Sequence, residues 1–519
     1  MDLDQRICDF ARRARDARFD GRFFIGVTTT GIYCRPICPA RAPKDEHVRY
    51  FATAAAAEAA GFRPCLRCRP EAAPGTPAWL GTSGLVSRAL RMIGEGALRC
   101  ESANGDNVDS LADRLGVTAR HLRRLFLQHL GATPLDVALS RRLHFAKKLI
   151  DETTLAFHQV AIAAGFGSLR RFNAEIRRTY ARTPTQLRRL ARPAYAKASV
   201  GQAAPDHDCY RLRLAYRPPY DWDAMLAFLA ARATPGVESV AGSRYRRTIA
   251  IDGRLGSIEV SRLDTRAALG LEVRFPDPRL LLVIVERVRR MFDLGADPAV
   301  IGEHLRADPL LRAPLGRHPG IRTPGAWDGF ELGVRAILGQ QIAVRAATTM
   351  AGRVAAMFGS PGCFPTPAQL ASAPLERAGI VRTRAESIRL LARRVVDGTI
   401  AFDSCIDTQA TIAALKDIPG IGDWTAEYIA MRALGEPDAF PRGDLVMRRM
   451  AGDCTPRDLE RRSQSWRPWR AYAVILLWQA ATDERRRISR STHAKPESRP
   501  KLRDRRRRAV VVSAAGSAR

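Results

Sequence analysis

The chain has 519 residues, enough for about three or four domains, and its 46% hydrophobic and 26% charged residues are typical of a globular protein. No apolar run is long enough to span a bilayer and the first residues contain no signal-peptide core, so we expect neither a membrane protein nor a secreted one. The formal net charge of +31 favours an acidic partner such as a nucleic acid, although an arginine-rich proteome would produce the same excess.

Four of the ten cysteines are clustered near the N-terminus. Cys34 and Cys38 form a C-x3-C pair, and Cys65 and Cys68 form a C-x2-C pair. Two short-spaced pairs can place four thiolates around one Zn²⁺, and a reducing compartment favours a metal site over disulfides. We therefore predict one Zn²⁺ per chain, held by these four cysteines. Two alternatives stay open: four unrelated buried thiols, and a zinc that is purely structural.

Residues 84–190 have helical periodicity and contain two segments with the pattern of a helix-turn-helix. In each segment a glycine permits the turn, at Gly116 and Gly165, and a hydroxyl caps the second helix, at Thr118 and Ser168. The second helix of each pair is then a recognition helix that reads the major groove of DNA. A solvated basic face is the alternative for either helix alone. The predicted DNA contacts are Arg120, His121, Arg124, Arg170, Arg171 and Asn173.

Residues 191–208 have the low complexity of a linker. Beyond them, alternating residues at 210–216, 248–251 and 257–260 predict strands, with a helix at 222–233 between the first two. From 327 to about 481 the pattern is helical again. Residues 481–519 form an arginine-rich tail without periodicity, which we predict to be disordered and to add at most nonspecific affinity for DNA.

Two features of the second helical region point to DNA chemistry. The sequence LKDIPGIGDWTAEY (415–428) places Gly420 and Gly422 around Ile421 in a tight turn between two helices, where backbone N–H groups can approach a phosphate. Further along, Asp444 follows a Pro/Gly loop and precedes an apolar helix. A carboxylate in that position can be catalytic, and an N-cap is its alternative role.

The N-terminal segments FFIGVTTTGIYCRPICPAR, HVRYF and AAAAEAAGFRPCLRCRP closely resemble the N-terminal domain of the Ada methyl-acceptor family. The resemblance implies that Cys34 accepts a methyl group from an Sp methylphosphotriester in DNA, with zinc keeping the sulfur ionised. Methylation removes one negative charge from the centre, so we expect DNA affinity to rise. The two helix pairs, ending in YARTP (180–184), resemble an AraC-type DNA-binding domain. The Pro-Cys-His-Arg sequence of Ada's O6-methylguanine half occurs nowhere in the chain, so we do not expect that activity.

The C-terminal segments PPYDWDAMLAFLAAR, FELGVRAILGQQ and WRPWRAY, together with the glycine hairpin, resemble the AlkA-type 3-methyladenine DNA glycosylases of the helix-hairpin-helix superfamily. The resemblance implies that Asp444 is the catalytic carboxylate and that Gln341 is the wedge filling the gap left by the flipped base. Enzymes of this superfamily that also cut the backbone have a Schiff-base lysine where this chain has Trp424, so we expect base release without lyase activity and without a cofactor. The resemblance also assigns Trp424, Tyr428 and Trp478 to the base pocket, with core packing as the alternative, and Gly420, Gly422 and Thr425 to a DNA-binding hairpin.

We therefore expect a multidomain α+β chain. Its predicted parts are a zinc methyl-acceptor domain (1–72), an all-α double helix-turn-helix domain (84–190), a linker (191–208), an antiparallel β-sheet with helices (209–315), an all-α helix-hairpin-helix glycosylase domain (316–480) and the basic tail (481–519). The expected function is an alkylation response, in which methylation of Cys34 switches on transcription while the glycosylase excises alkylated purines. We expect a cytoplasmic, nucleoid-associated monomer that binds double-stranded DNA and RNA polymerase but no membrane.

A second interpretation makes the protein a regulator and methyl sensor only, with a degenerate glycosylase half that merely binds DNA. Three features favour it: a glutamine at position 341, where the family usually has an apolar wedge, the short segment after Asp444, and the aberrant basic tail. Release of an alkylated base by the purified chain distinguishes the two interpretations.

Overall fold

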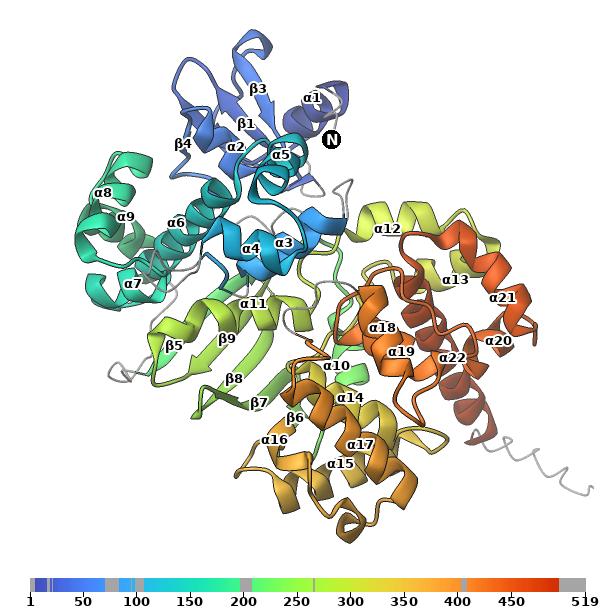
Figure 1. Cartoon of the computed structure of the whole chain (residues 1–519). Helices are drawn as coiled ribbons and strands as arrows, with labels where there is room; N and C mark the ends of the chain where they lie inside the picture. Colours follow the sequence, from blue (N-terminus) through green and yellow to red (C-terminus); the bar gives the residue numbers. More distant parts are fainter. Residues whose placement is uncertain are drawn as a thin grey trace, which may run out of the picture.

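The computed structural model describes residues 5–15, 19–20, 22–70, 84–94, 96–98, 107–196, 208–264, 267–402 and 408–493. Figure 1 shows a small N-terminal module at the top, a helical module below and beside it, a central β-sheet and a large helical lobe. The predicted fold class, a multidomain α+β chain, is confirmed. Within the described ranges, no helix is both long and apolar enough to cross a membrane.

The N-terminal module contains a four-stranded sheet in the order β3-β1-β2-β4, in which only β2 and β4 run parallel. One of its two small cores is built around Phe24, Tyr33, Phe51 and Phe62. A core of this size gives a small module little stability by itself, and a bound metal commonly supplies the rest. The elements are α1 (Gln5–Ala14), β1 (Phe24–Val27), β2 (Ile32–Cys34), β3 (Val48–Phe51), α2 (Ala54–Ala59) and β4 (Arg63–Pro64).

The helical module contains the two predicted helix-turn-helix units, joined by a long helix that begins at a capping box of Thr133 and Asp136. Its last helix continues to Ala196, so residues 191–196 of the predicted linker are helical. The rest of that linker, apart from residue 208, lies outside the described residues. The helices are α3 (Gly84–Gly94), α4 (Val108–Arg114), α5 (Ala119–Leu130), α6 (Pro134–Glu152), α7 (Phe157–Ala163), α8 (Leu169–Tyr180) and α9 (Pro184–Ala196).

The central sheet is antiparallel throughout, in the order β5-β9-β8-β7-β6. The predicted strands and helix are confirmed, but the prediction missed β6 and β9. Strand β9 pairs with both β5 and β8, and its alternating Leu269, Leu271 and Val273, which are almost fully buried, were the available signal. The elements are β5 (Cys209–Ala215), α10 (Trp222–Ala230), β6 (Glu238–Ala241), β7 (Arg244–Ile251), β8 (Arg254–Leu263) and β9 (Ala268–Arg274).

The helical lobe holds the largest core, which includes Trp466 and Tyr472. Its last helix runs to His493, so residues 481–493 of the predicted disordered tail are helical, and Ala481 at the start of this extension is buried. Residues 494–519 lie outside the described part. The helices after the sheet are α11 (Leu281–Met291), α12 (Pro298–Leu305), α13 (Pro309–Arg317), α14 (Gly329–Leu338), α15 (Val344–Phe358), α16 (Pro367–Leu370), α17 (Arg382–Val396), α18 (Thr408–Lys416), α19 (Asp423–Arg432), α20 (Leu445–Met450), α21 (Pro456–Ser463) and α22 (Arg470–His493).

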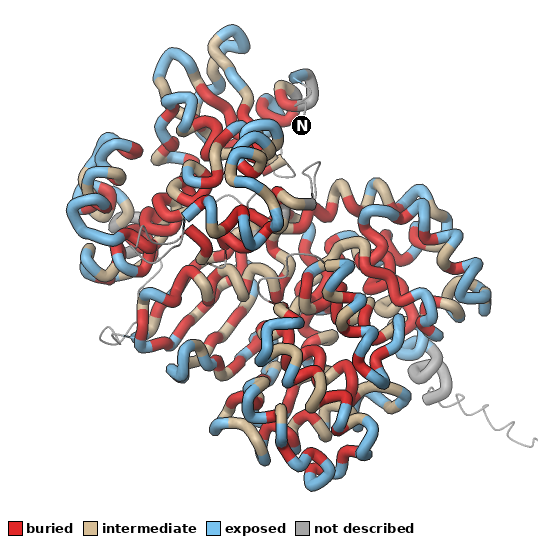
Figure 2. The backbone as a smooth tube through the Cα atoms, in the orientation of Figure 1, coloured by how far each residue is buried: buried red, intermediate tan, exposed pale blue. Residues whose placement is uncertain are grey.

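Helix α6 lies where three parts of the chain meet. It contacts α2 of the N-terminal module and β5 of the central sheet, and Figure 2 shows buried residues along it and along the strands. Arg69 pairs with Asp151 near the end of α6 at 2.5 Å. One residue further, Glu152 accepts a hydrogen bond from the backbone N–H of Arg213 in β5 at 3.0 Å. The helix therefore connects the N-terminal module to the sheet.

Candidate functional site

The structure brings the four predicted zinc ligands together. The Sγ atoms of Cys34, Cys38, Cys65 and Cys68 all lie within 4.8 Å of one another. Strand β2 ends at Cys34. The turn that follows is closed by a hydrogen bond from the N–H of Cys38 to the carbonyl of Arg35 (3.1 Å), and it brings the sulfur of Cys38 back toward that of Cys34. Cys65 and Cys68 are buried, whereas Cys34 and Cys38 are half-buried, so the first pair forms the accessible side of the cluster.

Arg35, for which the sequence suggested no role, connects the two cysteine pairs. Its backbone N–H donates to Sγ of Cys68 (3.3 Å), and its Nη1 donates to the carbonyl of the same residue (3.0 Å). Its Nε donates to Oδ1 of Asp20 (2.7 Å), and both charged side chains are buried. Such outer contacts orient metal ligands before the metal binds.

Hydrogen bonds among the sulfurs shift their pKa values in opposite directions. The bond with Cys34 lowers the pKa of Cys65 and lowers that of Cys38 to about 7, while it raises the pKa of Cys68. Four soft sulfur ligands at this spacing fit tetrahedral Zn²⁺, which holds all four as thiolates when it is bound. The donor set therefore fits the predicted cofactor.

Both helix-turn-helix units form where they were predicted. Thr118 and Ser168 cap α5 and α8, each accepting a hydrogen bond from the backbone N–H three residues further on at 3.2 Å. The two turns pass through Gly116 and Gly165 with φ angles of +68° and +81°.

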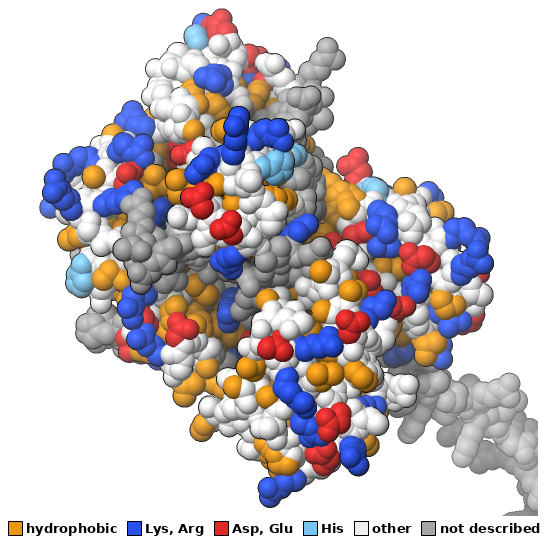
Figure 3. All heavy atoms as spheres, in the orientation of Figure 1, with side chains coloured by type: hydrophobic (Ala, Val, Ile, Leu, Met, Phe, Trp, Pro, Cys, Tyr) orange, Lys and Arg blue, Asp and Glu red, His pale blue; other side chains and the backbone are white. Residues whose placement is uncertain are grey.

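The recognition helices present a basic surface. His121 Nδ1 lies 3.1 Å from Nη2 of Arg124, so these two residues form one polar pair on α5. Figure 3 shows Lys and Arg side chains gathered over α5 and over α8 and α9. The individual DNA contacts remain predictions. Of the predicted set, Arg120, Arg124, Arg170 and Arg171 are exposed, and His121 and Asn173 are half-buried.

The glycine hairpin lies between α18 and α19, as predicted. Gly420 has a φ of +90°, and a Cβ atom there would lie 2.7 Å from Oγ of Ser387, so glycine is required. Gly422 is the N-cap of α19, and no side chain caps this helix. Thr425 is buried, and its hydroxyl accepts a hydrogen bond from Nε2 of Gln340 (3.0 Å). Thr425 therefore holds the hairpin from inside, whereas its predicted contact with DNA stays a prediction.

The predicted wedge, Gln341, lies in the turn between α14 and α15. It is exposed and has a φ of +56°, in the left-handed region that non-glycine residues rarely occupy. Backbone conformations of this kind often present a side chain for a function. The exposed position agrees with an inserting residue, and insertion itself stays a prediction.

Asp444 is held by three N–H donors. Its Oδ1 accepts from the backbone N–H of Met447 (2.8 Å) and from the indole of Trp478 (3.0 Å), and its Oδ2 accepts from the indole of Trp424 (3.0 Å). The hydrogen bond from Met447 makes Asp444 the N-cap of α20, which was its alternative role. Capping does not require the two hydrogen bonds from the indoles. Asp444 is 6% exposed, and in the described part of the chain no lysine or arginine forms an ion pair with it.

The three predicted pocket aromatics lie beside this carboxylate. The rings of Trp424 and Tyr428 are nearly parallel, at 7° with centroids 5.2 Å apart, and Trp478 lies 6.1 Å from Tyr428 at 43°. All three are half-buried, so they lie at the rim of the core. Because two of the indoles bind Asp444, the aromatic side chains and the carboxylate form one cluster.

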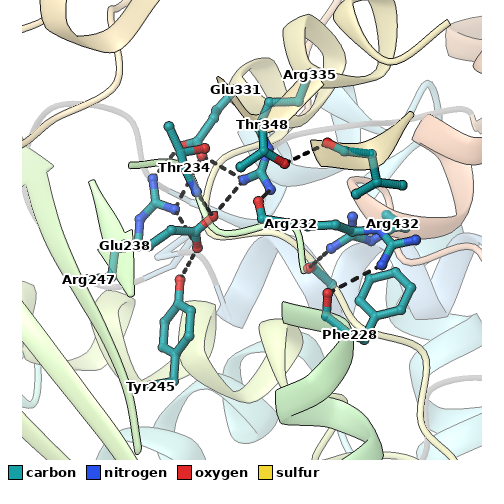
Figure 4. A network of polar contacts seen from close by, with 12 residues as sticks. Phe228, Arg232, Thr234, Glu238, Tyr245, Arg247, Glu331, Arg335, Thr348 and Arg432 are labelled. Carbon is teal, nitrogen blue, oxygen red and sulfur yellow. Dashed lines mark hydrogen bonds and ion pairs between the residues drawn. The ribbon is translucent and has the colours of Figure 1, made fainter. Parts of the chain in front are cut away.

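A buried ionic network between the sheet and the helical lobe was missed by the sequence analysis (Figure 4). Nη1 of Arg335 donates to Glu238 (2.8 Å) and to Glu331 (3.0 Å), and Arg247 pairs with Glu331. Tyr245 donates its hydroxyl hydrogen to Glu238. The only signal for this network was the i,i+4 spacing of Glu331 and Arg335 on an otherwise apolar helix. The network fixes the two parts of the C-terminal half against each other.

Arginines near this network also reach the aromatic cluster. Nη1 of Arg432 donates to the hydroxyl of Tyr428 at 2.7 Å. Burial would raise the pKa of Tyr428, but the positive charges of Arg432 and Arg232 and this hydrogen bond outweigh it and lower the pKa to about 8. The phenol of Tyr428 is therefore held by a buried arginine beside the two indoles.

Four families match successive parts of the chain: the metal binding domain of Ada (residues 8–71), a helix-turn-helix domain (111–190), the AlkA N-terminal domain (211–328) and the HhH-GPD superfamily of base excision DNA repair proteins (334–466). The first of these contains the cysteine cluster, and the last contains Trp424, Tyr428 and Asp444. The match to the Ada domain and the clustered sulfurs confirm the predicted site for one Zn²⁺.

Three relatives illustrate how the halves combine. The chain is 41% identical over 495 residues to the probable bifunctional transcriptional activator/DNA repair enzyme AlkA of Mycobacterium tuberculosis, covering 92% of this chain and 97% of that protein. It is 35% identical over 279 residues to DNA-3-methyladenine glycosylase 2 of Escherichia coli, covering 51% of this chain and 95% of that protein. It is 40% identical over 121 residues to the bifunctional transcriptional activator/DNA repair enzyme Ada of Escherichia coli, covering 23% of this chain and 31% of that protein.

Proposed function

Because the chain belongs to the family of bifunctional transcriptional activators and DNA repair enzymes of the AlkA type, we propose that Asp444 excises alkylated purines while Cys34 senses methylated DNA. The N-terminal half combines the zinc-binding domain of Ada with a helix-turn-helix domain that binds DNA. The C-terminal half is a DNA glycosylase of base excision repair. DNA is thus the acidic partner that the net charge of +31 favours.

The proposed substrates of the C-terminal half are 3-methyladenine and related N-alkylated purines. Alkylation at N3 or N7 gives the base a positive charge, so it is a good leaving group and is stabilised by stacking on electron-rich rings. Trp424, Tyr428 and Trp478 supply such rings. The name of the Escherichia coli relative, DNA-3-methyladenine glycosylase 2, agrees with this substrate class.

The observation that carries the glycosylase mechanism is the way Asp444 is held. Neutral N–H donors fix both oxygens, so the carboxylate keeps its negative charge for the sugar, on which positive charge develops as the base leaves. The base departs with the bonding electrons, and water adds to the sugar carbon and loses a proton. Trp424 stands where a Schiff-base lysine would be needed for strand cleavage, which supports base release without lyase activity.

The proposed sensor reaction is a single methyl transfer. The sulfur of Cys34 attacks the methyl carbon of a DNA phosphotriester: an S–C bond forms, the C–O bond breaks, and the phosphodiester leaves with the electron pair. With Zn²⁺ bound, the four thiolates would give the centre a charge of about −2, and methylation of Cys34 would reduce it to about −1 and so weaken its repulsion of DNA. The half-buried position of Cys34 at the end of β2 supports this role.

Cys38 is half-buried as well, so the acceptor must be assigned directly. After incubation of the zinc-loaded chain with methylphosphotriester DNA, tandem mass spectrometry should find one methyl group, on Cys34. A methyl group on Cys38 contradicts the assignment of the acceptor, and its absence from all four cysteines contradicts the sensor reaction.

We further propose that the two recognition helices contact adjacent major-groove segments of double-stranded DNA, that the DNA-bound chain activates transcription through RNA polymerase, and that it acts as a monomer. The exposed arginines on α5 and α8 support the first of these statements. Footprinting with the methylated and the unmethylated chain tests it, because the protected region should appear at a lower protein concentration after methylation.

Release of 3-methyladenine from methylated duplex DNA tests the glycosylase mechanism. We expect release by the full chain and a loss of roughly a hundredfold or more in Asp444→Asn, because electrostatic stabilisation of the transition state is removed. Asparagine is as good an N-cap as aspartate, so the variant should retain α20. Asp458→Asn, at an exposed acid on α21, is the matched control and should keep the wild-type rate.

Three other outcomes decide between the alternatives. No release by a well-folded wild-type chain contradicts the glycosylase mechanism and leaves the regulator-only interpretation. If Asp444→Asn releases the base as fast as the wild type, the glycosylase function is retained but Asp444 has no part in its mechanism. Loss in Asp458→Asn to the same degree assigns the effect to the charge of the lobe as a whole.

A further inference from the structure

We propose that Gln340 is a positioning residue that locks the wedge turn to the DNA-binding hairpin, so that both engage the duplex as one rigid unit. The proposal rests on the proposed glycosylase function. It goes beyond that function because it assigns the relative position of two separate DNA contacts to one side chain. That side chain lies next to Gln341 in sequence and against Gly420 in space.

The side-chain amide of Gln340 bridges the turn and the hairpin. Its Nε2 donates to the carbonyl of Gly420 (2.7 Å) and to Oγ1 of Thr425 (3.0 Å). The first acceptor lies in the hairpin turn, and the second lies on α19, which follows it. One amide group therefore fixes the hairpin at two points from the turn between α14 and α15.

The backbone of Gln340 is fixed as well. Its N–H donates to the carbonyl of Ile337 (3.3 Å), and its carbonyl accepts from Nη2 of Arg384 on α17 (2.5 Å). The peptide group before Gln340 is thus held by α14, and the peptide group that joins Gln340 to Gln341 is held by α17. The next residue, Gln341, is exposed in its left-handed conformation. A held peptide plane of this kind gives the wedge a defined direction.

Helix α17 holds the same hairpin from a second side. Oγ of Ser387 donates to the carbonyl of Pro419 (2.6 Å), next to the carbonyl of Gly420 that Gln340 occupies. Two consecutive carbonyl groups of the hairpin therefore accept hydrogen bonds from side chains of the protein itself. Arg384 and Ser387 lie on the same helix, so α17 is the common support of the wedge turn and the hairpin.

This arrangement has a mechanical consequence for base flipping. The hairpin binds the phosphate backbone while the wedge enters the base stack, so the distance between the two contacts must match the duplex. A misplacement of about 1 Å at such a constellation can cost a hundredfold in rate. Gln340 sets this distance by direct hydrogen bonds, whereas its loss leaves the wedge turn connected to the hairpin only through α17.

The experiment compares a lesion in a fully paired duplex with the same lesion in a small unpaired bubble. Gln340→Ala removes both bonds, and Gln340→Glu keeps the shape but cannot donate from that position. For both variants we expect base release from the paired duplex to fall roughly tenfold or more, and release from the bubble to stay near the wild-type rate. Fluorescence of a base analogue beside the lesion should report less extrusion in the paired duplex.

Two further variants make the result specific. Gln341→Ala should show the same dependence on pairing, because it removes the wedge that Gln340 positions. Gln464→Ala, at an exposed glutamine whose side chain hydrogen bonds with Glu460 and Arg467, should match the wild type on both substrates. Thermal unfolding of all variants checks that the lobe is folded.

The possible failures are distinct. Equal losses on the paired duplex and on the bubble indicate a general structural role and overturn the proposal, as does a normal rate of Gln340→Ala on the paired duplex. If the wild type releases no base from the paired duplex and none from the bubble, the result contradicts the proposed glycosylase function instead.

Discussion

In the N-terminal module four sulfurs come from two loops of a small sheet, whereas in the helical lobe a single carboxylate is held by donors from three helices, α19, α20 and α22. The module has two small cores, while the lobe packs its helices around an extensive one. A metal ion can therefore replace the packing that a small module lacks, and a large core can orient an ionised group without any metal. The two sites should respond differently to the loss of one partner.

The two regions are nevertheless connected by buried charges. Arg22 of the N-terminal module pairs with Asp297, the N-cap of α12, and Arg217 lies 3.5 Å from the same carboxylate. The side chains of Arg22 and Asp297 are 17% and 1% exposed. The zinc module is thus docked on the glycosylase half, and not merely joined to it by the covalent chain.

Removal of zinc should have the largest effect, confined to the N-terminal module. Structural zinc contributes about 10–16 kcal/mol of apparent binding free energy in small domains, which the core around Phe24 cannot replace. With a chelator or with Cys65→Ser, we expect the amides of β1 to β3 to lose protection from hydrogen exchange, while the rate of base release stays near that of the untreated chain. A parallel loss of base release would show that the two regions are not independent sites.

Loss of one donor to Asp444 should have an intermediate effect, confined to catalysis. Trp478→Phe keeps an aromatic ring but removes the indole N–H, and a hydrogen bond to a charged group contributes about 1.5–3 kcal/mol, or roughly tenfold to a hundredfold in rate. Single-turnover release of 3-methyladenine measures it. Zinc content and methyl transfer should not change, and an unaltered release rate would mean that Trp424 and Met447 alone position the carboxylate.

Breaking the connection between the regions should cost less. Arg22→Ala leaves Asp297 buried with Arg217 still 3.5 Å away, so we expect a loss of about 1–2 kcal/mol, below the 3–5 kcal/mol typical of an isolated buried pair. Denaturant unfolding measures it, and a double-mutant cycle with Asp297→Asn isolates the pair. Arg13→Ala is the control, because Arg13 and Asp45 are both largely exposed and such a pair contributes almost nothing. Equal effects of the two arginine variants would argue against docking.

The smallest expected effect depends on pH and concerns a contact within the C-terminal half, between the part that contains the central sheet and the helical lobe. His318 lies 2.5 Å from Asp221 and 2.7 Å from Asp483 of α22, and its hydrogen bond with Asp221 raises its pKa. Its stabilisation is therefore complete below the unfolded pKa of about 6.5 and is lost as the pH rises through the higher folded value. The difference in melting temperature between wild type and His318→Gln should shrink between pH 6 and pH 9, by a few degrees at most.

At low pH, the stabilisation from the contact between Asp221 and His318 changes with pH in the opposite direction. Burial would raise the pKa of Asp221, but its bond with His318 outweighs burial and lowers the pKa, so its contribution is present above about 3.9 and is lost as the pH falls through the folded value. A difference between wild type and His318→Gln that grows from pH 6 to pH 9 would contradict the assignment.

Much of each region could be predicted because its signals are local. The cysteine spacing, the caps at Thr118 and Ser168 and the turn at Gly420 all depend on residues within a few positions of one another. Strand β9, which the prediction missed, has the local signal of alternating Leu269, Leu271 and Val273, but its pairing with both β5 and β8 is known only from the sheet. The helical stretch 481–493 was mistaken for a disordered tail because it is rich in arginine and lacks apolar periodicity.

The sequence by itself determined the kinds of group present at each site: four sulfurs, one carboxylate, three aromatic rings and a glycine hairpin. Only the tertiary structure decided how these groups are held. The indoles on Asp444 are 20 and 34 residues away from it, Gln340 reaches a carbonyl 80 residues away, and Glu331 meets Arg247 at a separation of 84. Such contacts carry no spacing signal, because the chain between them is free to vary and the packing of separate helices and strands alone brings the partners within hydrogen-bond distance.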